Sequence, residues 1–592
     1  MHRRTLIALA GSLLMSPIAH AQPYRRVRPG EAGWPSAEQW KTLEAQLGGR
    51  LVAIEPPIEA CRAAPQSPDC AAFFRGLKNP WLVGDDPALT QTSGWAEAWA
   101  SSPSAYAVAA RDAADVAAAV TFAHTRRLRV AVKGGGHSYQ GTSNAPDSLL
   151  IWTRRIDRIE LHDAFVPQGC NAAPQPAVSL GAGVVWLQAY DAVSKAGRYV
   201  QGGGCTTVGV AGLIQSGGFG SFSKRYGLAA ASLIEAEVVT ADGTVRIANA
   251  CTNPDLFWAL KGGGGGSFGV ITRVTLKTHE LPSLFGAAFA GIKATSDAAF
   301  KRLIERFVGF YRESLFNPTW GETVSLRPEN ALEITMVFQG IDQEQAAAVW
   351  KPFFDWIGQQ AGDYTLVQPP LFLHVPARSL WDAAFLKQNA PQMVLSDERP
   401  GASATNVFWR SNLSEAGWFL HAYQSTWMPT ALLADDKRAQ FADSLFAASR
   451  RWRIALHFNK GLAGAPAEAI VAARDTATNP AMTEAFALAI SAAEGPPAFA
   501  GVAGHEPDLA KARDNARRVS AAMGELRSLV PQPGAYVSES NYFEADWQNA
   551  FWGANYPRLR AVKDRYDPDG LFFVHHGVGS EDWSPDGFTR LR

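Results

Sequence analysis

Two triple-glycine turns, each followed at once by a reactive side chain, constrain this 592-residue chain more than any other feature. The first is Gly134–Gly136 followed by His137, and the second is Gly202–Gly204 followed by Cys205. Because glycine has no Cβ, the backbone N–H groups of such turns can approach a bulky polyanion closely and form a concave anion site. The pattern predicts a nucleotide cofactor within reach of an imidazole and a thiol.

Length and composition indicate a multidomain globular protein. A chain of 592 residues exceeds what one hydrophobic core usually serves, so we expect two or more domains. The formal net charge is zero and no long run of lysine or arginine occurs, which excludes the electrostatic signature of a nucleic-acid or anionic-membrane binder. No stretch after the N-terminus approaches the length of apolar sequence that spans a bilayer, so we expect no membrane span.

The first 21 residues have the features of a secretory signal peptide. Arg3 and Arg4 supply a positive start, an apolar stretch covers 6–18, and Ala19–Ala21 forms a small-x-small cleavage site. We predict a signal peptide over 1–21 and a mature protein that is periplasmic or secreted. The paired arginines also admit a twin-arginine signal, which would export the protein after cofactor loading. A short N-terminal helix is the alternative.

Five cysteines follow the predicted cleavage site, and an odd count in an oxidising compartment leaves one thiol unpaired. Cys61 and Cys70 close a short ring, and Cys170 and Cys251 can form a second bridge. This pairing leaves Cys205 alone in its glycine turn. A free cysteine is either a reactive thiol or an inert buried one. The triple glycine before it and the two threonines after it favour the reactive interpretation.

The pattern of predicted elements changes along the chain. Residues 22–97 are expected to form an N-terminal extension wrapped on the main body. From residue 105, short strands and helices mix irregularly, with a helix over 111–126 and a hairpin over 233–247. From about residue 283 the segments are longer and contain many tryptophans, and the tail predicts a helix over 546–563 and a strand over 571–573. This order predicts α+β domains rather than a doubly wound sheet.

Four glycine-rich motifs then follow one another: GGGHSY, GGGC with VG after it, SGGFGSFSKRYGL and GGGGGSFGVIT. This series resembles the FAD-binding domain of the vanillyl-alcohol oxidase superfamily. The Cys205 motif, the stretch 555–559 and Asp567-Pro568 are similar to the berberine-bridge-enzyme-like oxidases. The resemblance covers roughly 100–280 and 530–580. It implies a two-subdomain PCMH-type FAD-binding domain over 98–282, an α+β substrate domain with an antiparallel sheet over 283–530, and a C-terminal segment over 531–592 that returns to the FAD domain.

The resemblance also implies where FAD is held. The histidine matching His137 is joined to the flavin 8α-methyl group, and the cysteine matching Cys205 to C6. An imidazole and a thiolate are suitable nucleophiles for an electron-poor ring. The remaining expected cofactor-binding residues are Lys133, Gly134, Gly135, Gly136, Ser138, Tyr139, Gly141, Gly204, Thr206, Val208, Gly209, Gly212, Gly217, Gly218, Gly220, Gly227 and Val270.

Two positions bear on reactivity. In the resembled family, the residue at the position of Val208 controls the access of dioxygen to the flavin, and a valine there accompanies oxidase activity. The alternative is that Val208 only packs beneath the flavin ring. Family members often carry Tyr-x-Asn-Tyr late in the chain, whereas here Tyr536 is followed by Ser538 and Glu539 in the last two places. A buried carboxylate can serve as general base, so Glu539 and Tyr536 are the expected catalytic residues. An exposed loop glutamate is the alternative.

Other candidates for the base are Tyr542 and the segment 457–460, while His575 and His576 are expected to flank the flavin without forming a metal site. The resemblance implies an FAD-dependent oxidase that passes hydride from an alcohol-type substrate to flavin and electrons to dioxygen. Tryptophans in the second domain favour a sugar substrate, although core packing explains most of them, and phenolic or alkaloid-like substrates are equally compatible. The rival functions are a flavin dehydrogenase with another acceptor and a secreted flavin-binding protein without turnover.

Overall fold

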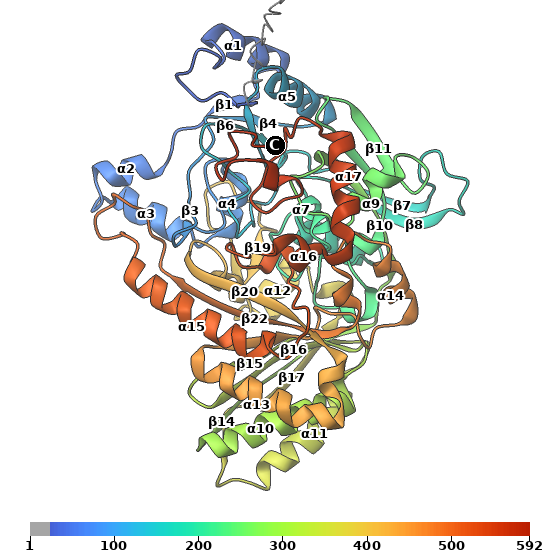
Figure 1. The fold of residues 1–592 in the computed structure, drawn as a ribbon. Coiled ribbons are helices and arrows are strands. Elements are labelled where there is room, and N and C mark those ends of the chain that lie inside the picture. Colours follow the sequence, from blue (N-terminus) through green and yellow to red (C-terminus); the bar gives the residue numbers. More distant parts are fainter. Residues whose placement is uncertain (1–23) are drawn as a thin grey trace, which may run out of the picture.

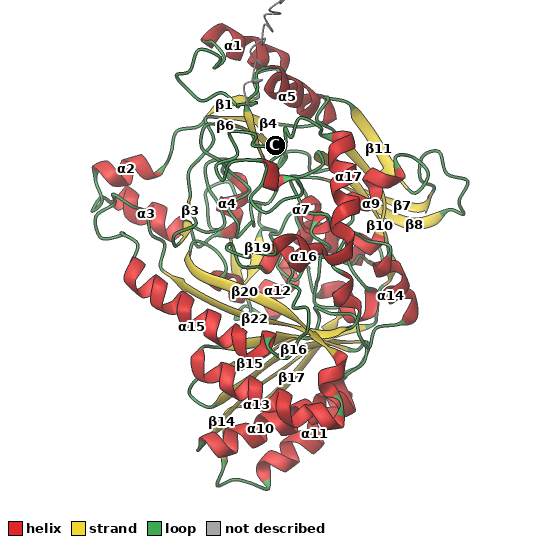
Figure 2. Ribbon diagram, in the orientation of Figure 1, coloured by secondary structure: helices red, strands yellow, loops and turns green. Residues whose placement is uncertain are grey.

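The computed structural model describes residues 24–592, and the predicted signal peptide lies outside them. Three main sheets and the helices around them build the molecule (Figures 1 and 2). In both views the nine-stranded sheet and its helices lie in the lower half, and the two smaller sheets lie above it. The mixture of helices with antiparallel sheets confirms the expected α+β class.

A four-stranded sheet carries the first glycine turn. Its strands lie in the order β1 (Leu51–Ala53), β4 (Tyr106–Ala109), β6 (Ser148–Trp152) and β5 (Arg129–Lys133). β4, β6 and β5 are parallel, while β1 runs antiparallel at the edge. The expected helix is α5 (Ala113–Thr125), which begins where the Asp112 side chain accepts a hydrogen bond from the backbone N–H of Asp115. β5 ends one residue before Gly134, so the sheet fixes where the turn starts.

A five-stranded antiparallel sheet stands beside it. Its order is β11 (Val245–Asn249), β10 (Leu233–Val239), β12 (Val270–Lys277), β8 (Gln175–Gly181) and β7 (Ile159–Phe165). The expected hairpin is confirmed as β10–β11, and its turn is held by Asp242, whose Oδ1 accepts from Thr240 and from the N–H of Thr244. Helices α6 (Trp186–Lys195), α7 (Val210–Gln215) and α9 (Pro254–Leu260) contribute buried side chains to the adjoining core.

The nine-stranded sheet is the largest element of the fold. Its order is β17 (Tyr364–Pro376), β14 (Leu284–Ala294), β16 (Ala331–Gln339), β15 (Trp320–Arg327), β21 (Ile454–His457), β22 (Ala485–Gly495), β20 (Phe419–Pro429), β2 (Gly94–Trp95) and β3 (Trp99–Ala100). All neighbours are antiparallel except β2 and β20. Helices α10 (Asp297–Phe310), α11 (Gln343–Gly358), α13 (Asp435–Arg451) and α15 (Leu509–Arg527) cover one face.

Side-chain alternation divides this sheet into two faces. On β21, Ile454 and Leu456 are fully or almost fully buried in the core beneath the helices. Ala455 and His457 of the same strand line a cavity toward the smaller sheets, as does Tyr423 of β20. Glu322 of β15 also lines this cavity, but its positive φ of 65° takes it out of the regular alternation of that strand. Because successive residues of a strand point to opposite faces, one sheet supplies both a core and a polar wall.

The N-terminal extension is shared between the sheets. β1 joins the four-stranded sheet, whereas β2 and β3 lie at the edge of the nine-stranded sheet. The remaining elements of the extension are α1 (Ala37–Gln46), α2 (Ile58–Ala63), α3 (Pro68–Gly76) and α4 (Pro80–Asp85). Smaller elements elsewhere are β9 (Arg198–Tyr199), β13 (His279–Glu280), β18 (Val394–Ser396), β19 (Val407–Trp409), α8 (Ser223–Tyr226), α12 (Ala383–Asn389) and α14 (Ala467–Arg474).

The C-terminal tail corrects two expectations. The helix expected over 546–563 is two helices, α16 (Trp547–Trp552) and α17 (Tyr556–Tyr566), because Gly553 has a positive φ of 53° and interrupts the α-helix. The strand expected over 571–573 is a single bridge, in which Phe572 pairs in parallel with Val130 of β5. In residues 24–592 there is no helix long and apolar enough to cross a membrane.

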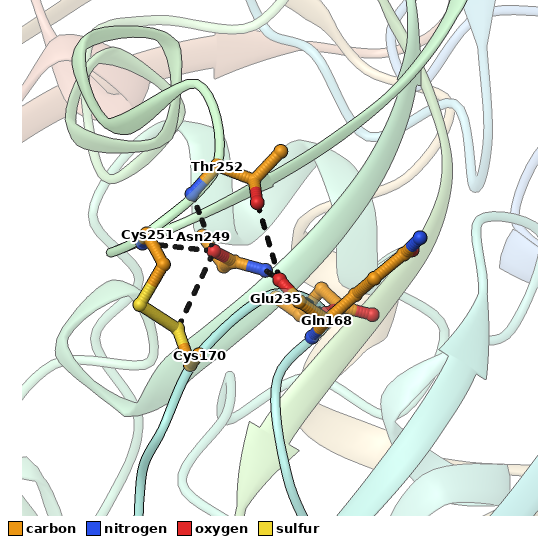
Figure 3. The surroundings of a disulfide bond; sticks show 6 residues. All are labelled: Gln168, Cys170, Glu235, Asn249, Cys251 and Thr252. Atoms are coloured by element: carbon orange, nitrogen blue, oxygen red, sulfur yellow. Dashed lines mark hydrogen bonds between the residues drawn. A yellow bond between two sulfur atoms is a disulfide. The ribbon is translucent and has the colours of Figure 1, made fainter.

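Both predicted disulfides are present, Cys61–Cys70 and Cys170–Cys251, and Cys205 is the free cysteine. Figure 3 shows the second bridge, which connects the loop after β7 to the segment after β11. Asn249 fixes this junction, because its Oδ1 accepts from the N–H of Cys251 and its Nδ2 donates to the carbonyl of Gln168. The disulfide therefore closes a junction that is also held by hydrogen bonds.

Candidate active site

A cavity of about 500 Å³ lies between the large sheet and the two smaller ones. Both glycine turns line it: Gly134–Gly136 with His137, and Gly203–Gly204 with Cys205. The second turn continues beyond Cys205 to Gly209. A Cβ on Gly135 would lie 2.6 Å from the backbone nitrogen of Gly209, so the two turns run in direct backbone contact. This close approach brings the imidazole and the thiol to one cavity.

The imidazole of His137 is neutral at ordinary pH. Burial, and secondarily the charge of Lys133, lower the pKa of His137 to about 4. Its Nε2 lies 2.9 Å from Oγ1 of Thr207, a residue of the second turn. A neutral ring held in this way keeps a lone pair on one nitrogen, which nucleophilic attachment requires.

Lys133 supports the first glycine turn from outside the cavity. Its Nζ donates to three carbonyl oxygens of the N-terminal extension, those of Val83, Asp86 and Leu89, at 2.6–2.7 Å. The side chain is buried and does not line the cavity. Lys133 thus fastens the extension to the end of β5, directly before the turn that carries His137.

The thiol of Cys205 contacts a carboxylate that the sequence analysis missed. Its Sγ lies 2.9 Å from Oε2 of Glu415, which precedes β20. Burial and the charge of Glu415 raise the pKa of the Cys205 thiol well above its ordinary value. Burial likewise raises the pKa of Glu415, opposed by the hydrogen bond from Cys205. This pair forms one polar corner of the cavity.

Glu539 lines the cavity and is engaged in an ion pair. Both of its carboxylate oxygens accept from Nζ of Lys460 at 2.6 Å. Glu322 lies on the same wall, where it accepts a hydrogen bond from Ser221 at 2.5 Å, and burial raises its pKa. The Glu539 side chain is only 18% exposed, so Glu539 is not the exposed loop glutamate of the alternative. Its role as a general base stays a prediction.

Aromatic side chains frame this polar wall. Tyr139 and Tyr423 stack with ring centroids 5.3 Å apart, and burial raises the pKa of each phenol well above its ordinary value. Tyr536 meets Phe219 edge to face, with 5.2 Å between ring centroids, and burial raises its pKa too. All four side chains line the cavity. Neutral phenols can therefore donate hydrogen bonds into it.

The two C-terminal histidines line another part of the cavity wall. His575 stacks on Tyr542 at 3.7 Å, and its Nε2 lies 2.8 Å from the Tyr542 carbonyl. His576 stacks on Trp547 at 5.2 Å, and burial lowers its pKa to about 3. Both rings are uncharged at neutral pH and serve as packing surfaces.

The expected cofactor-binding residues divide into two groups. Those that line the cavity are His137, Cys205, Gly134, Gly135, Gly136, Ser138, Tyr139, Gly204, Val208, Gly209 and Gly212. Those that do not line it are Lys133, Gly141, Thr206, Gly217, Gly218, Gly220, Gly227 and Val270. Several of the latter glycines permit close packing instead: Gly141 lies against the ring of Trp99, and Gly217 lies against Thr478.

The cavity suits a large polar cofactor. Gly212 has open space on its Cβ side, so a side chain there would enter the volume that the glycine turns leave free. Gln140 and Gln215 line the cavity, and the Oε1 atom of each is buried without a hydrogen-bond partner within residues 24–592. Unpaired buried acceptors are costly, so they indicate donors supplied by a bound molecule. Glycine backbone and such polar groups fit the pyrophosphate and ring edges of FAD.

Fold and site together define an FAD-dependent oxidoreductase. Residues 104–249 match the FAD binding domain family, and residues 535–579 match the family described as berberine and berberine like. The expected resemblance is confirmed: both segments match models of FAD-linked oxidase families, and the similar proteins are VAO-type and FAD-linked oxidoreductases.

Known relatives span nearly the whole chain. The VAO-type flavoprotein oxidase VAO615 of Thermothelomyces thermophilus is 29% identical over 99% of this chain and 98% of its own. The FAD-linked oxidoreductase penH of Penicillium thymicola is 29% identical, over 99% of this chain and 99% of its own. The crystal structure of MtVAO615 from Myceliophthora thermophila C1 superposes with a TM-score of 0.76 at 25% identity and covers 95% of this chain and 98% of that one.

A more distant structure shares the fold. Glucooligosaccharide oxidase from Acremonium strictum, which carries a 6-S-cysteinyl, 8α-N1-histidyl FAD, superposes with a TM-score of 0.62 at 19% identity. It covers 88% of this chain and 99% of that chain.

Proposed function

We propose that this protein is an exported oxidase that holds FAD through both His137 and Cys205. The main observation behind this proposal is that both side chains line one cavity and lie on turns whose backbones are in contact. A doubly attached FAD named for a structural neighbour supports the proposal. So do the two disulfides, which are typical of proteins outside the reducing cytosol. Covalent attachment would also prevent cofactor loss after export.

The attachment has a direct test. Acid-precipitated wild-type protein should remain yellow, and Cys205→Ala should keep its flavin through His137 alone. His137→Ala should keep it through Cys205 wherever the variant folds. Peptide mass spectrometry locates each link. Release of free FAD from the denatured wild-type protein would refute covalent attachment altogether.

FAD, when bound, accepts the hydride in the reaction that we propose. The substrate is an alcohol-type molecule, either a sugar or a phenolic or alkaloid-like compound, and Glu539 takes its hydroxyl proton. The position of Glu539 on the cavity wall supports this role, and its carboxylate is held by a contact with Nζ of Lys460. Tyr536 completes the wall as a hydrogen-bond donor. Glu539→Gln should lower kcat by about 100-fold or more, which is the usual contribution of a general base, and retain the flavin spectrum.

The tryptophans give weaker support to a sugar substrate than the sequence suggested. Trp320, Trp350, Trp381 and Trp427 are buried in the core. Trp418 lines the cavity, but Nζ of Lys78 lies 3.0 Å from its ring centroid. A panel of sugars, phenols and alkaloids, scored by flavin bleaching without oxygen, decides the substrate class. A competent flavin that no compound bleaches would favour a flavin-binding protein without turnover.

Dioxygen is the electron acceptor in this proposal. Val208 supports it, because it lines the cavity beside the turn of Cys205. Reduced protein should reoxidise within seconds in air-saturated buffer and release hydrogen peroxide. Slow reoxidation in air, with fast turnover on a quinone, would instead identify a dehydrogenase.

A further inference from the structure

The thiol of Cys205 is hydrogen-bonded to an acceptor that comes from a distant part of the chain. Oε2 of Glu415 lies 2.9 Å from its Sγ, although 210 residues separate the two. The backbone of Glu415 is fixed on both sides: its carbonyl accepts from Nε2 of Gln91, and its N–H donates to the carbonyl of Asn412. The carboxylate is thus positioned by contacts that do not involve the thiol.

This arrangement matters because a thiol must lose its proton before it becomes a good nucleophile. Burial keeps the Cys205 thiol protonated, and no lysine or arginine within residues 24–592 forms an ion pair with Glu415. Burial also makes Glu415 a stronger proton acceptor than an exposed carboxylate, since it raises the pKa of that group. The acceptor and the donor are already in hydrogen-bond contact, so a proton can move between them directly.

We propose that Glu415 is the proton acceptor for Cys205 when this thiol forms the second link to FAD. The inference rests on the proposed double attachment. The S–H bond breaks and its proton passes to Glu415 as sulfur forms a bond to a flavin ring carbon. The hydrogen on that carbon leaves as a proton, and two electrons remain on the flavin, which dioxygen then takes up to give hydrogen peroxide.

Glu415→Gln tests the role, because glutamine keeps the size and the hydrogen-bond acceptor but cannot take the proton. Cys205 is the free cysteine, so alkylation of denatured, non-reduced protein reports whether its sulfur is linked. The wild-type protein should resist alkylation. E415Q should keep its flavin through His137 while most of its Cys205 is alkylated. Glu539→Gln, the same change at a cavity carboxylate paired with Lys460, is the matched control and should resist alkylation like the wild type.

Incubation at raised pH supplies a second readout. Because hydroxide can replace Glu415 in removing the thiol proton, incubation of E415Q at pH 9.5 in air should restore resistance to alkylation. Glu415→Ala with added formate should do the same at neutral pH, and this variant serves if E415Q does not fold.

The outcomes separate the two proposals. If the wild-type cysteine is alkylated, the double attachment itself fails. If the wild type and E415Q both resist alkylation to the same extent, the attachment stands and the role of Glu415 is overturned. Equal alkylation of E415Q before and after the pH 9.5 incubation, with no rescue of E415A by formate, also overturns it.

Discussion

At the scale of single residues, buried polar side chains of the site contact one another in pairs. Lys460 and Glu539 have side chains only 11% and 18% exposed. The attraction between the two therefore offsets much of the free-energy cost of burying each of them. Cys205 and Glu415 form a second pair, in which the thiol donates a hydrogen bond to the carboxylate. Such pairs are sensitive to the loss of one partner, because the other is then left buried with its charge or its polar atom unsatisfied.

The Lys460–Glu539 pair predicts a specific pattern of stabilities. Lys460→Met leaves the Glu539 carboxylate without its cation and should lower the free energy of unfolding by about 3 kcal/mol. The double change Lys460→Met with Glu539→Gln should cost less than the single one, because no uncompensated charge remains. Urea unfolding followed by tryptophan fluorescence measures these two variants and the Glu539→Gln single variant, which completes the cycle. Strictly additive losses would show that the two side chains are not coupled.

At the scale of elements, loops are held in place by ties between segments that lie far apart in the chain. Lys133 joins β5 to the N-terminal extension through three carbonyl groups. The Cys170–Cys251 bridge joins the loop after β7 to the end of β11. The two glycine turns are fixed by contact between Gly135 and Gly209. The loops that line the cavity are therefore preorganised by their supporting elements.

The two disulfides should differ in their contribution to stability. The Cys170–Cys251 bridge spans 81 residues and the Cys61–Cys70 bridge spans 9. Because a longer closed loop restricts the unfolded chain more, removing the longer bridge with paired serines should cost about 4.5 kcal/mol, and removing the shorter one about 2 kcal/mol less. Thermal and urea unfolding of the two double-serine variants provides the comparison. A larger loss from the shorter bridge would contradict the loop-length argument.

At the scale of the whole molecule, neutral buried histidines should make the fold sensitive to acid. Burial lowers the pKa of His279 to about 4 and that of His576 to about 3. In the unfolded chain these groups titrate near 6.5. Between the two values the unfolded chain binds more protons, so the free energy of unfolding should fall as pH drops from about 6.5 toward 4.

His576→Phe isolates one contribution to this slope, because phenylalanine can keep the stack on Trp547 but cannot take a proton. We expect a shallower decrease of unfolding free energy between pH 6.5 and 4 than in the wild type. Urea unfolding at four pH values within this range measures it. Parallel curves for the two proteins would show that His576 does not contribute to the acid sensitivity.

The sequence by itself determined that FAD is the expected cofactor, the pairing of the disulfides and most elements of the FAD-binding region, and it marked the two glycine turns that line one cavity. These features depend on local signals: triple glycines, a capped helix after Asp112, a turn centred on Asp242 and an odd cysteine count. The break at Gly553 was missed, although a glycine is a local signal, because isolated glycines are often tolerated within helices.

Only the tertiary structure decided the composition of the polar wall. Glu415 meets Cys205 across 210 residues, and Glu539 meets Lys460 across 79. Neither partner carries a local pattern that predicts the contact, since a single glutamate or lysine is compatible with any exposed loop. The order of strands in the nine-stranded sheet determines which side chains face the cavity. That arrangement goes with burying the other face of the sheet beneath its helices. The sequence thus specified the cofactor, and the packing of the sheets specified the chemical groups around it.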